Sequence, residues 1–473
     1  AQLQYVTIGG TKAGKVTHYQ LHAIQDSGGF ADMGTILAPF MTRPMSSGVY
    51  AIPNIECRTT SVVTNTTPIV AYRGAGRPEA TAAIERAMDM FALEIGKDAA
   101  EVRRMNLIPK FLEPHTTVVG QTYDVGDYET ALDKALAAAD YKALRAEQAK
   151  RRASGDAKQL GIGVSVYVEI TGGVGNGESA KVEVLEDGRA VVYTGTSPHG
   201  QGHDTAWSML VQEQTGIPMD RIELVWGDTD LVPVGTGTMG SRSLQQGGNA
   251  VFQVAGTLAE KAKSVAARLL EVSEADVVLD KARGAFHVVG TPAVTKTWAD
   301  LAVAEKSTGG LLHDEVINVS GATFPFGAHV AVVEVDTETG RVKHLRQVAC
   351  DDAGKVLNPM LLDGQIHGGV AQGVAQALLE EVLYDADGNP TTSNLADYGF
   401  ISAAELPNVE VIHMETPTPV NAIGAKGIGE SGTIGSTPAI QSAVVDAVSH
   451  LGVKHIEMPC TAERVWRAIQ AAQ

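Results

Sequence analysis

The most informative stretch of the chain is Lys426-Gly427-Ile428-Gly429-Glu430-Ser431-Gly432-Thr433-Ile434-Gly435, which is followed closely by Thr437-Pro438. Glycines let a backbone turn sharply and press against a ligand. A proline just after a threonine is a good first residue of a helix, so we predict a helix that begins near Thr437 and turns free N–H groups toward that ligand. Glu430, the one carboxylate of the stretch, would project into a cavity as a base.

A lone glycine-rich segment is most often a solvated loop, but four other segments of this chain have the same character. They are Ala71-Tyr72-Arg73-Gly74-Ala75-Gly76-Arg77, His199-Gly200-Gln201-Gly202-His203, Gly240-Ser241-Arg242-Ser243 and Asp363-Gly364-Gln365-Ile366-His367-Gly368-Gly369. The first lies immediately before a predicted helix that begins near Pro78, where backbone donors are free. We expect all five bends to converge on one ligand.

In order, spacing and residue types, the five segments resemble the molybdenum hydroxylases. That family includes xanthine dehydrogenase, aldehyde oxidoreductases and the large subunit of aerobic carbon monoxide dehydrogenase. The resemblance runs from near Gly14 to the C-terminal helix, and residues 71–77 are most similar to the form II carbon-monoxide-dehydrogenase-like group. It implies an α+β fold with two elongated mixed α/β molybdopterin-binding domains of the xanthine dehydrogenase/aldehyde oxidase type.

The resemblance also implies a cofactor and the residues around it. The cofactor is molybdopterin with molybdenum, in bacteria usually as molybdopterin cytosine dinucleotide, and the pterin rather than a side chain holds the metal. The catalytic base is Glu430, whose pKa we expect to be raised by partial desolvation, and the substrate pocket includes Ala75 and Arg73. The implied cofactor-binding residues are Arg73, Gly74, Gln201, Gly202, Gly240, Ser241, Arg242, Ser243, Gln365, Lys426 and Gly427. Arg242, the only fixed positive charge of its loop, would meet phosphate, although a surface salt bridge is an alternative.

Two positions depart from well-understood relatives. Copper-containing carbon monoxide dehydrogenases have a cysteine where this chain has Gly74, and without a thiolate Cu(I) has no ligand. Xanthine dehydrogenase has a phenylalanine at the position of Ala75, so a purine would lose a stacking partner. We therefore expect hydroxylation of an aldehyde or an N-heterocycle carbon with water-derived oxygen, with the aldehyde slightly favoured. Carbon monoxide oxidation without the copper ligand and an inert cofactor-binding fragment stay open as alternatives.

Composition limits the partners. A net charge of −18 over 473 residues argues against nucleic acid. Cys57, Cys350 and Cys460 lie too far apart for an iron–sulfur cluster or a disulfide framework. The resemblance implies separate iron–sulfur and FAD subunits, assembled as a dimer of heterotrimers. No apolar run approaches the roughly 18 residues of a membrane span, so we expect a soluble, cytoplasmic protein.

The chain opens on Ala1 and lacks the hammerhead-like domain and the Gly-Gly-x-Phe-Gly loop of the family, so we expect an N-terminal portion of the large subunit as a further partner. An exposed connector at 151–156 marks a predicted boundary. Residues 1–155 would be the rest of the first molybdopterin-binding domain with a connector, and 156–473 the second domain. Predicted helices cover 78–95, parts of 121–155, 204–214, 249–272 and 364–381, and predicted strands cover 180–184, 189–193, 222–226, 330–335 and 342–349.

Other kinds of site have weaker support. Residues 235–240 and 427–432 fit Gly-x-Gly-x-x-Gly, but neither follows a buried strand and leads to a suitably placed acidic residue, so a pyrophosphate cradle is favoured over an NAD domain. His199 and His203 have the spacing of a zinc pair, yet Gly200 and Gly202 argue against a shared helical face. Paired aspartates at 351–352 and at 228 and 230 fit turn capping better than Ca²⁺ or Mg²⁺. The segment 172–177 is either a substrate-side loop or a plain connection.

Overall fold

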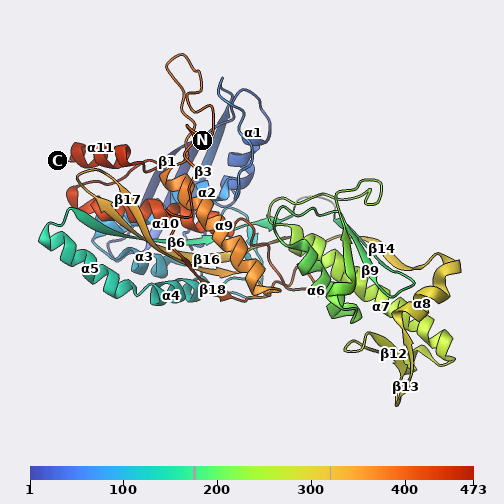
Figure 1. Ribbon diagram of the computed structural model, residues 1–473. Coiled ribbons are helices and arrows are strands. Elements are labelled where there is room, and N and C mark those ends of the chain that lie inside the picture. Colours follow the sequence, from blue (N-terminus) through green and yellow to red (C-terminus); the bar gives the residue numbers. More distant parts are fainter. Residues whose placement is uncertain (174–176, 320, 473) are drawn as a thin grey trace.

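The computed structural model describes residues 1–173, 177–319 and 321–472. Residues 174–176 of the segment 172–177, for which a substrate-side role is one interpretation, lie outside the described residues. The chain forms two lobes (Figure 1). The larger lobe contains both ends of the chain, and the smaller lobe contains the middle of it, from about residue 178 to 317.

The centre of the larger lobe is a four-stranded sheet with the order β18-β17-β16-β6. Its strands are β6 (Lys158–Val168), β16 (Phe326–Asp336), β17 (Val342–Asp352) and β18 (Val409–Met414). Successive residues of a strand point to opposite faces. On one face, Val330 and Val332 pack with α4 (Tyr128–Ala138). On the other, Ala331 and Val333 pack with α9 (Pro359–Leu378) and α10 (Ser431–Val448).

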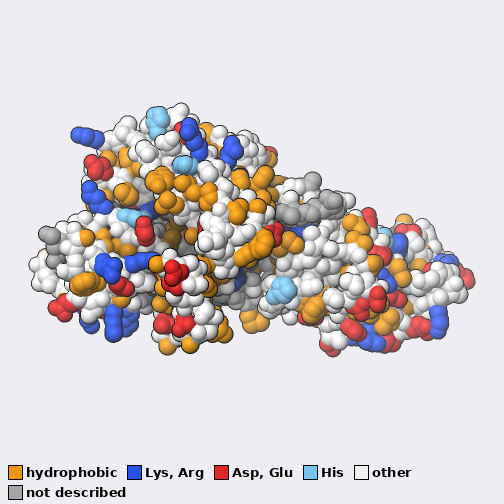
Figure 2. Space-filling model, turned by 90° about the horizontal axis from the view of Figure 1, so that it is seen from above, with side chains coloured by type: hydrophobic (Ala, Val, Ile, Leu, Met, Phe, Trp, Pro, Cys, Tyr) orange, Lys and Arg blue, Asp and Glu red, His pale blue; other side chains and the backbone are white. Residues whose placement is uncertain are grey.

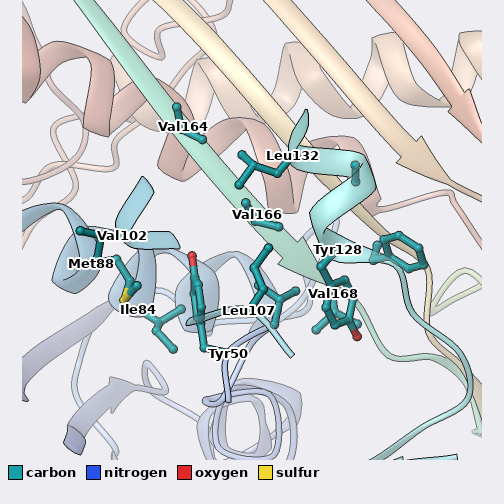
Figure 3. Close-up of a cluster of buried hydrophobic side chains, with 14 of the residues drawn as sticks. Tyr50, Ile84, Met88, Val102, Leu107, Tyr128, Leu132, Val164, Val166 and Val168 are labelled. Atoms are coloured by element: carbon teal, nitrogen blue, oxygen red, sulfur yellow. The ribbon is translucent and has the colours of Figure 1, made fainter. Parts of the chain in front are cut away.

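The core on the α4 face of the sheet continues into the N-terminal part of the lobe. Figure 3 shows it beside β6, where Val164, Val166 and Val168 meet side chains such as Tyr50 and Ile84. The other elements of this lobe are β1 (Gln2–Gly10), β2 (Val16–Asp26), β3 (Asn54–Val62), β4 (His115–Thr116), β5 (Thr122–Tyr123), α1 (Met33–Leu37), α2 (Arg77–Ile95), α3 (Ala99–Asn106), α5 (Tyr141–Ser154) and α11 (Ala462–Ala472).

The smaller lobe is built on a sheet with the order β10-β9-β8-β14, against which α6 and α7 share an apolar core. A second sheet, β11-β12-β13, lies beside α7. These elements are β8 (Glu178–Val184), β9 (Ala190–Thr194), β10 (Ile222–Val225), β14 (Leu311–Ile317), α6 (His203–Thr215), α7 (Asn249–Leu270), β11 (Val277–Asp280), β12 (Ala285–Val288), β13 (Thr291–Thr297) and α8 (Trp298–Glu305). The short strands β7 (Thr171–Gly172) and β15 (Ala322–Thr323) pair where the chain passes between the lobes.

Most of the local predictions are confirmed. The hairpin of β8 and β9 is present, and α2, α6, α7 and α9 occupy the predicted helical segments. Gly96 ends α2 with φ of 66°, a left-handed conformation that glycine adopts without strain. Asp98 caps α3 by accepting hydrogen bonds from the N–H groups of Ala100 and Glu101.

The predicted start of the last long helix is wrong. Helix α10 begins at Ser431 rather than near Thr437, and Pro438 lies inside it. The glycines of this stretch are there for close packing as well as for turning. A Cβ atom at Gly432 would lie 2.7 Å from the carbonyl oxygen of Ile366 in α9, and one at Gly435 would lie 2.7 Å from the ring of His329 in β16. The free N–H end of the helix therefore lies next to Glu430.

The predicted domain boundary falls between α5 and β6. Both elements lie in the larger lobe, and Gln148 Nε2 donates a hydrogen bond across this junction to the carbonyl oxygen of Leu160 at 2.8 Å. A division of the chain at residue 155 stays a prediction.

The surface mixes charges of both signs. On the face shown in Figure 2, acidic and basic side chains are interspersed, and hydrophobic side chains gather over the middle of the larger lobe. Among the helices of the described residues, none is both long and apolar enough to cross a membrane.

Candidate functional site

A cavity of about 500 Å³ is lined by residues of both lobes. The structure brings all five glycine-rich segments to it, although they are spread over more than 350 positions of the sequence. The site residues named from the sequence that line it are Arg73, Gln201, Gly240, Ser241, Ser243, Gln365, Lys426, Gly427 and Glu430. Gly74, Ala75, Gly202 and Arg242 are not among the lining residues.

Glu430 lies on the wall of this cavity immediately before α10, with 14% of its side chain exposed. Its Oε1 atom accepts a hydrogen bond from the backbone N–H of Gly74 at 2.9 Å. Its Oε2 atom accepts from Arg77 Nη2 at 2.9 Å and from Ser241 Oγ at 2.7 Å. Three donors from two distant segments, 71–77 and 240–243, therefore fix one carboxylate in place.

Both of these segments have strained backbones. Ala75 has φ of 30° and Ser241 has φ of 52°, and they are two of only four non-glycine residues with positive φ in the described part of the chain. Side chains disfavour this conformation, and such strain gathers at functional sites. Here it accompanies the Gly74 N–H and the Ser241 hydroxyl, which both point at Glu430.

The expected upward shift of the Glu430 pKa is wrong. Burial alone would raise the pKa, but the Arg77 charge and the hydrogen bonds from Ser241 and Gly74 stabilise the ionised form more, so the pKa is lowered from its ordinary value. Glu430 is therefore ionised at neutral pH and ready to accept a proton. The sequence could not indicate this, because Arg77 and Ser241 are far from Glu430 along the chain.

A second carboxyl group, that of Glu169, shares Arg77 with Glu430 and was not identified as a site residue from the sequence. Its side chain is fully buried directly after β6. Burial, together with the nearby Glu430 charge, raises the pKa of Glu169 to about 8. One feature of the sequence could have indicated it. Glu169 directly follows the apolar strand β6, and an acidic residue buried at such a position is rarely without a partner.

Arg73 ties the cavity walls together. Its Nε donates to the carbonyl oxygen of Gly429 at 2.5 Å, its Nη1 to Gln372 Oε1 at 3.0 Å, and its Nη2 to the carbonyl oxygen of Gln365 at 3.0 Å. Nη2 also lies 3.3 Å from Gln365 Oε1. The guanidinium therefore holds α9 against the loop of Glu430 while it lines the cavity.

The residue that follows the first Gly-x-Gly-x-x-Gly segment, Ser241, touches the second segment. A Cβ atom at Gly427 would lie only 1.8 Å from the carbonyl oxygen of Ser241, so only glycine fits there. The neighbouring Lys426 has a buried ammonium group, which donates to Asp352 Oδ1 at 3.0 Å and lies 4.7 Å from the centre of the Phe326 ring. This pair fixes the start of the loop from inside the larger lobe.

Arg242 differs from its prediction. Its side chain is 1% exposed, forms an ion pair with Glu178, and donates to the carbonyl oxygen of Gly237 at 2.9 Å. The charge that was expected to meet a phosphate is thus neutralised inside the smaller lobe. A guanidinium so deeply buried needs a carboxylate partner, and no local pattern indicates that Glu178 supplies it.

The cavity also fits a polar ligand on its other side. His203, the first residue of α6, lines it and is 3% exposed, and its two ring nitrogens have no hydrogen-bond partner among the described residues. The ring stacks on Trp207 with centroids 4.6 Å apart. Burial lowers the pKa of His203 to about 4, so the ring is neutral at pH 7 and offers one donor and one acceptor. Buried polar atoms of this kind fit a polar group such as a pterin.

No group of three or more His, Cys, Asp or Glu side chains within the described ranges is placed to hold a metal ion. In the predicted cofactor the pterin, not a side chain, holds the metal. The glycine contacts at Gly427 and the unpaired imidazole of His203 fit such a cofactor.

Two family models match this chain, over residues 1–107 and 134–407, and both describe a molybdopterin cofactor-binding domain. The chain belongs to the molybdopterin cofactor-binding family. It is 39% identical, over 480 aligned residues, to the carbon monoxide dehydrogenase large chain of Hydrogenophaga pseudoflava, an alignment that covers 97% of this chain and 60% of the relative.

Solved structures agree with this family. The Cu,Mo-CO dehydrogenase in its carbon monoxide reduced state matches with a TM-score of 0.92 and 35% identity, over 100% of this chain and 62% of that one. Quinoline 2-oxidoreductase from Pseudomonas putida 86 matches with a TM-score of 0.92 and 32% identity, over 99% of this chain and 62% of that one. The predicted resemblance to molybdenum hydroxylase large subunits and the predicted α+β fold are confirmed. This molybdopterin-binding chain spans about 60% of the length of the relatives it matches.

Proposed function

We propose that this chain is the catalytic, molybdopterin-binding part of the large subunit of a molybdenum hydroxylase. The enzyme would hydroxylate an aldehyde or an N-heterocycle carbon with oxygen from water. One observation carries the proposal: five distant segments line one cavity, and an ionised Glu430 held by three donors lies on its wall.

The residues that would hold the cofactor line this cavity. They are Gln201, His203, Gly240, Ser241, Ser243, Gln365 and Gly427. When bound, the cofactor supplies the redox centre and the Lewis acidity for the reaction. Glycine at 427 allows the backbone of Ser241 to approach closely, and the neutral His203 ring offers a donor and an acceptor.

Glu430 would be the proton acceptor. Its carboxylate is mostly shielded from water, and Arg77, Ser241 and the Gly74 N–H orient its oxygens. A positioned base typically contributes about 10² to 10⁴ in rate. The low pKa of Glu430 keeps it ionised, so the base is ready whenever substrate enters the cavity.

The geometry at Gly74 argues against copper. This residue has φ of 99°, and a Cβ atom there would lie 2.6 Å from Pro78 Cγ. No thiolate can therefore be introduced at this position without a rearrangement, and copper-dependent oxidation of carbon monoxide is disfavoured. The likeness to quinoline 2-oxidoreductase supports the N-heterocycle class, and the absence of an aromatic side chain at Ala75 supports a smaller aldehyde.

The finer assignments extend the same proposal. The cofactor would be molybdopterin cytosine dinucleotide, and iron–sulfur and FAD subunits would receive the electrons, because the three cysteines of this chain are free and cannot hold a cluster. An N-terminal portion of the large subunit would complete the protein, within a cytoplasmic dimer of heterotrimers.

The test uses the complete complex. Molybdenum and released cytidine nucleotide are measured on the purified complex, and aldehydes and N-heterocycles are then screened anaerobically by dye reduction. We expect close to one molybdenum and one cytidine nucleotide per chain, with turnover in one substrate class. A complex that contains neither would favour an inert cofactor-binding fragment and would contradict the proposal.

A further inference from the structure

The carboxyl groups of Glu169 and Glu430 share the same donors. Arg77 Nη2 lies 3.2 Å from Glu169 Oε1 and 2.9 Å from Glu430 Oε2. Ser241 Oγ lies 3.4 Å from Glu169 Oε1 and 2.7 Å from Glu430 Oε2. A hydroxyl group can donate one hydrogen bond, and at these distances Ser241 donates it to Glu430. Glu169 keeps one short donor of its own, Ser431 Oγ, at 2.6 Å from Oε2.

The single positive charge of Arg77 does not balance two ionised carboxyl groups in this shared contact. Arg77 forms a salt bridge with each carboxyl group, and no other cation does so among the described residues. The charge of Arg73 is close enough to interact with both carboxyl groups, but its guanidinium donates hydrogen bonds only to uncharged oxygens. Two carboxylates beside one guanidinium in a buried site repel each other, and one proton on the pair removes that repulsion.

None of the remaining titratable neighbours among the described residues forms a salt bridge with the pair. On β6, Tyr167 donates to Asp351 Oδ1 at 2.6 Å, and burial raises its pKa well above the ordinary value, so it stays neutral. His329 on β16 also contacts Asp351, at 3.1 Å. On α2, Glu79 is close enough to influence Arg77, and burial raises the pKa of its carboxyl group.

We propose that Glu169 is a positioning residue that carries the one proton of this carboxyl pair, so that the Arg77 charge is committed to Glu430. In this state Glu430 is the single negative charge among the described residues that line the cavity. When Glu169 loses its proton to solvent at alkaline pH, Arg77 is divided between two carboxylates and Glu430 loses part of its anchor. The pair therefore titrates in two macroscopic steps, with Glu430 losing its proton at acidic pH and Glu169 near pH 8.

This inference deepens the proposed function, and one test does not depend on turnover. Infrared spectra of the purified complex are recorded from pH 6 to pH 10, and the spectra of Glu169→Gln are subtracted from those of the wild type. The subtraction matters because Glu79 and Glu85 also have raised pKa values. We expect a protonated-carboxyl band at pH 7 in the difference spectrum that disappears as the pH rises through about 8. A difference spectrum without that band would overturn the proposal even if the complex is an active hydroxylase.

A second variant addresses the case in which Glu169→Gln does not fold. Ser431→Ala removes the short donor to Glu169, so the ionised form loses a hydrogen bond and the transition should move to higher pH. Ser436→Ala is the matched control, because this buried serine on the same helix donates to the carbonyl oxygen of Gly432 at 2.6 Å. We expect the control to keep the wild-type transition. Equal behaviour of the two serine variants would contradict the role of Glu169.

The activity profile gives an independent readout. In the wild type, kcat/KM should fall above the second transition, and in Glu169→Gln this alkaline decrease should be absent while the acidic limb from Glu430 stays. A purely structural role of Glu169 would lower kcat/KM at every pH by the same factor. Persistence of the alkaline decrease in Glu169→Gln would overturn the proposal, and a complex without turnover would bear only on the proposed function.

Discussion

Among the described residues of the larger lobe, two buried arginines each contact two carboxyl groups, and the two arrangements differ in charge balance. In the core cluster, Arg103 lies 2.8 Å from Glu85 and 2.8 Å from Asp89. In the site cluster, Arg77 lies 3.2 Å from Glu169 and 2.9 Å from Glu430. Both clusters contain one carboxyl group with a raised pKa and one with a lowered pKa. Perturbed pKa values alone therefore do not distinguish a structural cluster from a functional one.

The difference lies in the number of cations and in the origin of the residues. The core cluster has a second arginine, because Arg86 Nη1 contacts Asp89 at 2.9 Å, so two cations meet two carboxylates. All of these residues come from α2 and α3, which are adjacent in the chain. The site cluster has one cation, its members come from three distant segments, and Ser241 of the smaller lobe completes it. An unbalanced cluster at a junction of two lobes can change its protonation, whereas a balanced one inside a lobe stabilises the fold.

The largest effect should follow from breaking the core cluster. Arg103→Ala leaves Glu85 buried beside Asp89 without their common cation, and breaking a buried ion pair typically costs about 3–5 kcal/mol. Arg104→Ala is the control, because the neighbouring Arg104 is 37% exposed and its pair with Asp133 lies at the surface, where such pairs contribute about 0–1 kcal/mol. Urea unfolding of both variants measures the free energies. Similar values for the two would contradict the comparison.

Glu430→Gln should have the opposite profile, a large loss of activity with little loss of stability. The amide keeps the size of the side chain but cannot accept a proton, and a positioned base contributes at least about 100-fold in rate. Cofactor content should remain close to that of the wild type. Glu94→Gln, at an exposed position near the end of α2, is the control and should be fully active. Glu430→Gln activity within a few-fold of the wild type would remove Glu430 from the catalytic role.

The elements that the sequence predicted well are those set by local patterns. The apolar spacing of α2, its stop at Gly96 and the cap at Asp98 depend on neighbours within a few residues, and all three are present. The residue types and spacing of the motifs also identified the five segments that line the cavity. These features need no knowledge of which distant segments meet.

The features that the sequence did not predict depend on distant contacts. The low pKa of Glu430 arises from Arg77 and Ser241, which are 353 and 189 positions away. The burial of Arg242 depends on Glu178, 64 positions away. The start of α10 was misplaced because its glycines were interpreted as turn residues, whereas Gly432 packs closely on the backbone of Ile366. In each case a tertiary contact overrides the local pattern.

Two glycines near Ser241, at positions 427 and 429, allow a matched test within the site. Gly427→Ala would place a Cβ atom 1.8 Å from the carbonyl oxygen of Ser241, so one loop must move, at a cost of about 1–3 kcal/mol. This movement would also withdraw the Ser241 hydroxyl from Glu430. We expect reduced cofactor content and a smaller loss of activity than in Glu430→Gln. Gly429→Ala is the control, because a Cβ atom there meets Ser241 Oγ at an ordinary 3.4 Å. Equal losses in both glycine variants would show that the contact at Gly427 is not the cause.

The smallest effect should come from the helix that carries Arg103. Asp98 caps α3 with Oδ1 hydrogen bonds from the Ala100 and Glu101 N–H groups at 2.9 and 3.1 Å, and replacing such a cap by alanine costs about 1 kcal/mol. Arg103 lies in the last turn of α3 and is anchored by two carboxylates, so it should keep its place when the first turn frays.

Asp98→Asn is the control for this cap, since its side-chain oxygen can still accept both N–H bonds. We expect Asp98→Ala to lower the unfolding free energy by about 1 kcal/mol and to leave kcat/KM unchanged, because none of the affected residues lines the cavity. A loss as large as that of Arg103→Ala would mean that the core cluster depends on the folding of its helix. Charge balance would then no longer separate the two clusters.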